Sequence, residues 1–197
     1  MRSEKNNISL IWKSFQSGNK EAFAYLYNLY VNDLYRYGTK LCRDYELVKD
    51  AIQEVFIDLY IKRTKNKMDP EYLKYYLVLA LRRNLIKKLK RNRKLSDENP
   101  ENELLFEPDY NIENIIIERE EDEEKIKTVR KAIIQLPAKQ KEVIYLRFNE
   151  ALEYDQIANL FGITIESARK QVYRALKTIR ESCNKQSVVL WIVIKRK

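Results

Sequence analysis

The stretch that decides the fold is residues 154–180, which read YDQIANLFGITIESARKQVYRALKTIR. Its apolar residues recur every three or four positions, which is typical of amphipathic helices. The pattern is interrupted at Gly162, a residue type that can adopt the left-handed backbone of a tight turn. Two helices, at about 155–160 and 165–180, are therefore predicted on either side of that turn. This arrangement is typical of a helix-turn-helix unit.

The second of these helices carries more basic than acidic residues. Helical periodicity predicts an outward face made of Glu166, Ser167, Arg169, Lys170, Tyr173, Arg174 and Lys177. Arginine can bond guanine edges in a major groove, and lysine can neutralise phosphate. The pattern favours a helix that reads DNA. An ordinary helical hairpin with a solvated basic face is the alternative.

Working outward, apolar residues at helical spacing predict further helices over 15–41, with a possible break before 34, and over 48–59, 72–89 and 114–136. Asp69 is a suitable N-cap for the third of these, with Pro70 in the first helical position. Tyr72 and Tyr76 are expected in the core, and Pro137 ends the last helix. Because no pair of strands is left over, the predicted fold class is all-α.

Charge divides the 197-residue chain into modules. The net charge is +9, but residues 96–124 hold thirteen acids and one base, a net −12, so the rest of the chain carries +21. Residues 82–94, just before, contain eight bases and no acid. Two prolines and a polar run mark an irregular linker. The predicted organisation is two small helical domains, at 1–95 and 114–183, joined by an acidic linker at 96–113 and followed by a tail at 184–197.

Composition excludes several function classes. The chain has no histidine, three isolated glycines and two distant cysteines. Histidine-based catalysis, phosphate-binding glycine loops and structural zinc are therefore not expected, and neither is a cofactor or a metal. The longest apolar run, 188–194, is far shorter than a membrane helix, so a soluble cytoplasmic protein is expected. A Mg²⁺-dependent nuclease using Glu118–Glu124 is a weak alternative, because consecutive helical carboxylates point in different directions.

The first module offers two candidate surfaces. Asp50, Gln53 and Glu54 lie beside apolar residues on one predicted helix, which suits a helical protein partner or a solvated face. The next helix leads from tyrosines into a basic cluster, a combination that can stack on unpaired bases and follow phosphates.

Taken together, these stretches resemble the bacterial RNA polymerase sigma factors of the compact extracytoplasmic-function (ECF) type. The resemblance covers about residues 22–180. It rests on the order of several short motifs: AFAYLY at 22–27, DAIQEVFIDLY at 50–60, Arg83-Asn84 before a basic cluster, Leu136-Pro137, Glu142-Val143, YDQIA at 154–158 and Arg174-Ala175-Leu176.

The resemblance implies a transcription-initiation subunit without catalysis of its own. The first module would be region 2, which docks on the β′ clamp helices of core RNA polymerase through Asp50, Gln53, Glu54, Phe56 and Leu59. It would bind the melted −10 strand through Lys65, Asn66, Lys67, Tyr75, Arg82, Arg83, Asn84, Lys87, Lys88 and Arg91. The second module would be region 4, with the outward face of 165–180 in the −35 major groove and another surface on the β flap.

Three further expectations accompany this resemblance. It implies a sequestering anti-sigma partner in the inner membrane. The apolar tail run at 188–194 either packs on region 4 or serves as a docking peptide, and no loop residue matches the family's base-capturing position. The rival hypothesis is a stand-alone helix-turn-helix regulator, which has no need for the helix at 50–60 followed by a basic helix.

Overall fold

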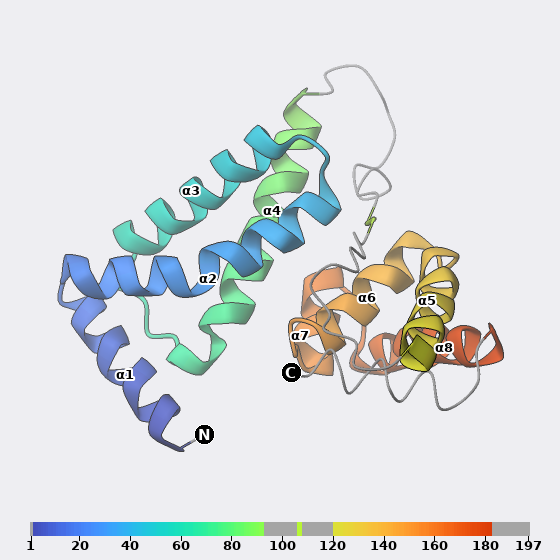
Figure 1. The fold of residues 1–197 in the computed structure, drawn as a ribbon. Helices are drawn as coiled ribbons and strands as arrows, with labels where there is room; N and C mark the ends of the chain where they lie inside the picture. Colours follow the sequence, from blue (N-terminus) through green and yellow to red (C-terminus); the bar gives the residue numbers. More distant parts are fainter. Residues whose placement is uncertain (1, 93–105, 108–119, 183–197) are drawn as a thin grey trace. The chain divides into compact units, whose positions relative to one another are not determined.

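The computed structural model describes residues 2–92, 106–107 and 120–182 (Figure 1). Every regular element in these ranges is helical, so the all-α prediction is confirmed. The chain divides into unit 1, Met1–Leu105, and unit 2, Phe106–Lys197. The elements are α1 (Arg2–Gln16), α2 (Lys20–Leu41), α3 (Tyr45–Ile61), the short 3₁₀ helix η1 (Pro70–Tyr72), α4 (Leu73–Asn92), α5 (Glu120–Ile134), α6 (Ala138–Phe148), α7 (Tyr154–Phe161) and α8 (Ile165–Ser182).

In unit 1, helices α2, α3 and α4 pack against one another, as Figure 1 shows. Their shared core is made of aliphatic and aromatic side chains, among them Leu26, Leu34, Tyr37, Val48, Leu59, Leu77, Leu81 and Leu85. A Cβ on Gly38 of α2 would lie 2.7 Å from Cγ1 of Val48 on α3. The absence of a side chain at this position therefore lets the two helices approach closely.

Helices α1 and α2 are separate, although a single helix from Phe15 through residue 30 was predicted. The break is at residues 17–19, where Gly18 has a φ of 94° that only glycine adopts easily. Asn19 then starts α2, because its side chain accepts a hydrogen bond of 2.8 Å from the amide of Ala22. The sequence left open whether a new helix starts near Leu34, and in the structure α2 runs to Leu41 without a break.

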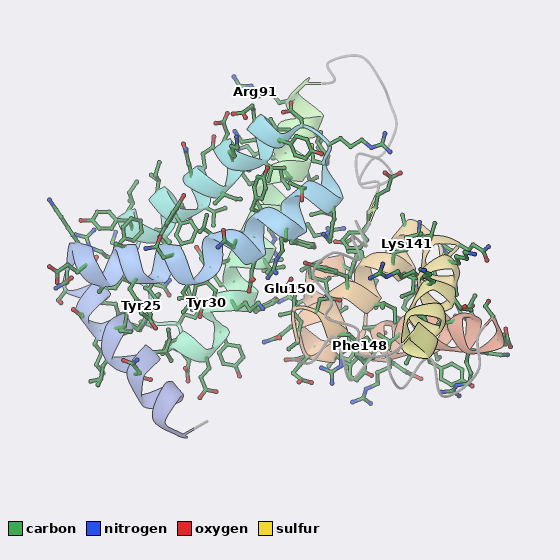
Figure 2. The ribbon with its side chains drawn as sticks, viewed as in Figure 1. Tyr25, Tyr30, Arg91, Lys141, Phe148 and Glu150 are labelled. Carbon is green, nitrogen blue, oxygen red and sulfur yellow. The ribbon has the colours of Figure 1, made fainter. Side chains whose placement is uncertain are left out.

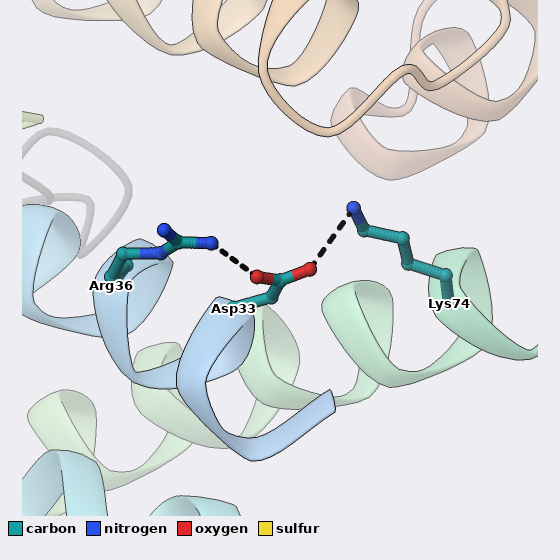
Figure 3. Close-up of polar contacts among 3 residues, drawn as sticks. All are labelled: Asp33, Arg36 and Lys74. Carbon is teal, nitrogen blue, oxygen red and sulfur yellow. Dashed lines mark hydrogen bonds and ion pairs between the residues drawn. The ribbon is translucent and has the colours of Figure 1, made fainter. Parts of the chain in front are cut away.

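A polar contact joins α2 to the first turn of α4 (Figure 3). The Asp33 carboxylate pairs with Arg36 on its own helix and with Lys74 on α4, at 3.3 Å from its Nζ atom. Tyr30 lies one turn before Asp33 and is near Tyr25 on the same helix (Figure 2). Burial raises the pKa of Tyr30. Partly exposed pairs of this kind contribute roughly 0–1 kcal/mol, so the apolar core dominates the stability of unit 1.

In unit 2, helices α5, α6 and α7 each pack against α8. The core residues include Val129, Ile133, Val143, Ile144, Leu146, Ile157, Ala168, Val172 and Ile179. Pro137 lies between α5 and α6, as predicted for a helix-ending residue.

Phe106 belongs to the packing of unit 2, although it falls inside the predicted linker. Its side chain is 1% exposed, and its ring centroid lies 5.4 Å from that of Tyr145 on α6. The boundary between the two units falls between residues 105 and 106, inside the range 96–113. The rest of that linker except Glu107, the predicted helix start at 114–119 and the tail at 184–197 lie outside the described residues.

Candidate partner and nucleic-acid interfaces

Helices α7 and α8 form the predicted helix-turn-helix. Gly162 ends α7 in the left-handed conformation, with φ 63° and ψ 36°. An added Cβ would meet nothing within 4 Å, so it is the backbone conformation that favours glycine here. Thr164 then starts α8, since its Oγ1 accepts a hydrogen bond of 3.1 Å from the amide of Ser167. The turn that the sequence indicated is therefore built from a glycine stop and a threonine cap.

Helix α8 has one buried face and one exposed face. Ala168, Val172, Ala175 and Ile179 are buried at helical spacing. Six of the seven residues predicted to read DNA are exposed: Glu166, Arg169, Lys170, Tyr173, Arg174 and Lys177. Tyr173 is 67% exposed, which is unusual for an aromatic side chain on a packed helix. Ser167, the seventh, is half-buried and belongs to the cap.

Arg169 on this face contacts the ring of Tyr154, which Arg147 also contacts. The sequence argument assigned neither Tyr154 nor Arg147 to this face. The ring of Tyr154, at the start of α7, lies 5.6 Å from the Arg169 guanidinium carbon and 4.8 Å from that of Arg147 on α6. Arg147 is itself held by the Leu152 carbonyl at 2.8 Å and the Glu153 carboxylate at 3.1 Å. Cations over a tyrosine ring attract its electron-rich face, so this stack orients Arg169.

The exposed face of α3 differs from the predicted polymerase-binding set at two positions. Asp50, Gln53 and Glu54 are exposed, in agreement with the prediction. Phe56 is 2% exposed and Leu59 is fully buried, so both serve the core of unit 1 and are not available to a partner. The apolar residues that share the exposed face are Ile57, at 56%, and Ile61, at 68%.

Glu54 also connects α3 to α4. Its carboxylate accepts hydrogen bonds from Nδ2 of Asn84 at 2.8 Å and from Nζ of Lys88 at 2.7 Å. The bond from Lys88, followed by the bond from Asn84, lowers the pKa of the Glu54 carboxyl. The sequence argument placed Glu54 in one interface and the other two residues in another, whereas the structure brings all three together.

The basic residues of α4 fall into different environments. Arg83, Lys87, Lys90 and Arg91 are exposed at spacings of three and four and form one stripe; Figure 2 shows Arg91 near the end of the helix. Arg82, also predicted to contact DNA, is 5% exposed, so its side chain packs in unit 1 and is not displayed with this stripe. Its position is at the edge of the core face, one turn after the buried Val78 and one turn before the buried Leu85, which explains the burial.

The tyrosines at the start of this segment are also in different environments. Tyr75 is half-buried. Tyr72, predicted in the core, is instead 50% exposed. Tyr76 is half-buried, and burial, with a smaller effect from Asp58, raises the pKa of its hydroxyl.

The loop at 62–69 connects α3 to η1. Lys65 and Lys67 are exposed and Asn66 is half-buried. The side-chain oxygen of Asn66 accepts a 3.0 Å hydrogen bond from the amide of Met68, and the predicted N-cap Asp69 accepts one of 2.9 Å from the amide of Glu71. The two lysines are therefore displayed on a loop that has internal hydrogen bonds.

Comparison with known families matches both units. The family model described as Sigma-70 region 2 matches residues 26–95, and that described as Sigma-70, region 4 matches residues 126–179. Together the two matches cover α3, η1, α4, α6 and α7 and most of α2, α5 and α8.

Two curated proteins are similar over most of their length. RNA polymerase sigma factor SigV of Bacillus subtilis is 26% identical over 156 residues, which is 79% of this chain and 87% of the relative. RNA polymerase sigma-H factor of Pseudomonas aeruginosa is 27% identical over 171 residues, which is 83% of this chain and 87% of the relative.

A solved structure has a similar fold. It is the sigma factor RpoE from Bartonella quintana, in complex with the anti-sigma factor NepR. The TM-score is 0.52 at 20% identity, with 81% of this chain and 95% of the other covered. The chain belongs to the sigma-70 family of RNA polymerase sigma factors, in its compact ECF form. As a sigma factor it binds core RNA polymerase and promoter DNA and directs the initiation of transcription.

No described helix is long and apolar enough to cross a membrane. Among the residues whose side chains the structure describes, no group of three or more His, Cys, Asp or Glu residues could hold a metal ion, and the side chains of Glu118–Glu124 lie outside that part of the chain.

Proposed function

We propose that α8 reads the −35 element of the promoter from the major groove. The observation that carries this proposal is the separation of the two faces of α8, with apolar side chains buried and Arg169, Tyr173 and Arg174 exposed. Arginine can bond guanine O6 and N7 with two hydrogen bonds, and the tyrosine ring can contact a thymine methyl group. Lys170 and Lys177 contact phosphates on either side.

The polymerase-binding surface is the exposed face of α3. Asp50, Gln53 and Glu54 provide its polar part, and Ile57 and Ile61 provide the apolar part that was expected of Phe56 and Leu59. Apolar side chains surrounded by polar ones at one helix face are typical of protein interfaces. The partner is the pair of β′ clamp helices of core RNA polymerase.

The melted −10 strand binds to the loop at 62–69 and to the stripe on α4. Lys65 and Lys67 are exposed on the loop, and Arg83, Lys87 and Arg91 with Lys90 form the stripe. Exposed cations at regular spacing can follow the phosphates of a single strand. Asn84 and Lys88 lie beside this stripe, held by Glu54 in the free protein.

Four further parts of the proposal depend on the family. Unit 2 has a second surface that rests on the polymerase β flap, and an anti-sigma protein sequesters the free chain, as the solved relative is bound by NepR. The protein acts in the cytoplasm, where polymerase and promoters are found. It performs no catalysis itself, because the polymerase supplies the active site.

Reconstitution with core polymerase tests this function. Purified chain and core enzyme should form a complex by size-exclusion chromatography and then transcribe from promoter DNA that core enzyme alone does not use. Absence of a complex would overturn the proposal and favour a stand-alone helix-turn-helix regulator, which would bind DNA without polymerase.

A further inference from the structure

The loop at 62–69 is held by a residue far away in the sequence. Gln16, the last residue of α1, donates a hydrogen bond of 2.6 Å from Nε2 to the backbone oxygen of Asn66. The side-chain oxygen of Asn66 is already bonded to the Met68 amide. Both oxygens of Asn66 are therefore engaged, one within the loop and one to α1.

The C-terminal part of α1 is a firm anchor for this bond. Trp12 and Phe15 are buried, with ring centroids 5.3 Å apart. The Phe15 ring also lies 5.9 Å from that of Phe23 on α2 and 6.3 Å from that of Tyr60 on α3. Aromatic clusters of this kind bury large areas and have restricted geometry, so the backbone of α1 near Gln16 is fixed on the bundle.

Other contacts bring α1 and the turn after it to the two ends of the loop. Helix α1 packs against η1, which follows the loop. At the start of the loop, the Arg63 guanidinium lies 4.2 Å from the Tyr60 ring centroid and donates a 2.8 Å hydrogen bond to the Tyr60 carbonyl. A Cβ on Gly18, in the turn after α1, would lie 3.7 Å from the same guanidinium. The loop is thus supported at its start, middle and end by α1 and the turn after it.

We propose that Gln16 is a positioning residue for recognition of the −10 strand: it holds the loop at 62–69 in the arrangement that the DNA meets. This inference rests on the proposed function of that loop. The region 2 family model begins at residue 26, so α1 lies outside the part of the chain that the family match covers. A loop that is ordered before binding loses less conformational entropy on binding. The expected benefit is specificity for the promoter strand, with little effect on general affinity for single-stranded DNA.

Three variants separate this role from general effects. Gln16→Met keeps length and neutrality but removes the N–H donor, and Gln16→Lys keeps an N–H donor on a chain of similar reach. Asn7→Met is the matched control, because Asn7 is an exposed amide on the same helix. If Gln16→Met folds poorly, Gln16→Glu replaces it, since a carboxylate cannot donate a hydrogen bond.

The measurement uses holoenzyme assembled from core polymerase and the full chain. Two fluorescent single-stranded probes of equal length are compared: the non-template −10 strand of a promoter that the wild type transcribes, and oligo(dT). Gln16→Met should lower the preference for the promoter strand about fivefold, the effect of one hydrogen bond. Affinity for oligo(dT) and for core polymerase should change less than about twofold, Gln16→Lys should restore the preference, and Asn7→Met should match the wild type.

Two results would overturn the inference. One is an unchanged preference in Gln16→Met. The other is an equal loss on both probes and in polymerase affinity, which would indicate general damage to unit 1. Failure of the wild type to bind polymerase or to prefer the promoter strand would instead contradict the proposed function, and the inference would fall with it.

Discussion

Helices α4 and α8 both carry a row of basic residues, but the two rows have different environments. On α8 the buried positions are apolar, and Arg169, Lys170, Arg174 and Lys177 are all exposed. On α4, Arg82 is buried and Lys88 is bonded to Glu54, while the remaining bases form an exposed stripe. A basic row in a sequence is therefore not one functional surface, because packing by neighbouring helices decides which cations can reach DNA.

The largest expected effect is on α8. Arg169→Ala and Arg174→Ala should each weaken binding to the −35 element by about 1–3 kcal/mol, roughly 5- to 150-fold, and relax base preference at one position. Lys177→Ala should weaken binding to all sequences alike. It should also reduce, by about 1, the steepness with which the logarithm of the binding constant falls with the logarithm of the salt concentration. Fluorescence anisotropy with promoter duplexes at several salt concentrations measures both effects.

Core polymerase affinity is the control for these variants and should not change. Wild-type −35 affinity in both arginine variants would contradict the placement of α8 in the major groove.

The difference between buried and exposed arginines on α4 can be tested with the neighbours Arg82 and Arg83. Arg82→Ala should lower the free energy of unfolding by about 1–3 kcal/mol, because it removes a buried side chain together with the polar interactions that it makes. Arg83→Ala should change stability by less than about 0.5 kcal/mol and instead weaken single-stranded DNA binding. Urea denaturation and a DNA titration of each variant provide the comparison. The reverse pattern would show that Arg82, and not the exposed stripe, contacts DNA.

The correction on α3 predicts a smaller effect. Ile57→Ala and Ile61→Ala should each weaken core polymerase binding by about 1 kcal/mol. Each truncation removes apolar surface that is exposed in the free chain and that the polymerase would bury. Thermal stability of the free chain should hardly change. The control is Tyr45→Ala, which removes another exposed apolar side chain near the opposite end of α3. If both isoleucine variants bind polymerase as tightly as the Tyr45→Ala control, the partner contacts another surface.

The smallest expected effect concerns the contact from Glu54 to Lys88. Because the folded-state pKa of Glu54 is lowered, its contribution to stability is present above the unfolded value of about 4.3 and is lost as the pH falls through the folded value. Glu54 is more than half exposed, so the contribution at pH 7 is below about 1 kcal/mol.

Urea unfolding of the wild type and of Glu54→Gln at neutral and at acid pH measures this pH-dependent contribution of Glu54 to stability. The wild type should be slightly more stable at about pH 7 and equal to the variant at about pH 3. A stability difference that does not depend on pH would mean that the Lys88 contact contributes nothing through charge.

The sequence predicted the helix-turn-helix well because α7 and α8 follow one apolar period and a glycine, Gly162, ends α7 between them. The same reasoning did not separate Phe56 from Ile57, since both are apolar neighbours on one helix and only the packing of α2 and α4 decides which is buried. Phe106 has no apolar period around it, so its place in the core of unit 2 had no sequence signal.

Contacts between distant elements were likewise beyond the sequence argument. Glu54 lies 34 residues from Lys88, and Gln16 lies 50 residues from Asn66. The tertiary placement of the helices brings each pair together, and helical periodicity describes one helix at a time.

The central claim is that unit 2 recognises promoters through the exposed face of α8. Genome-wide mapping of transcript starts, with holoenzymes containing the wild type or Arg174→Ala, tests it most directly. The account predicts that wild-type starts share one sequence block at the −35 position and that Arg174→Ala loses these starts while still binding polymerase. An unchanged set of start sites in the Arg174→Ala holoenzyme would contradict it.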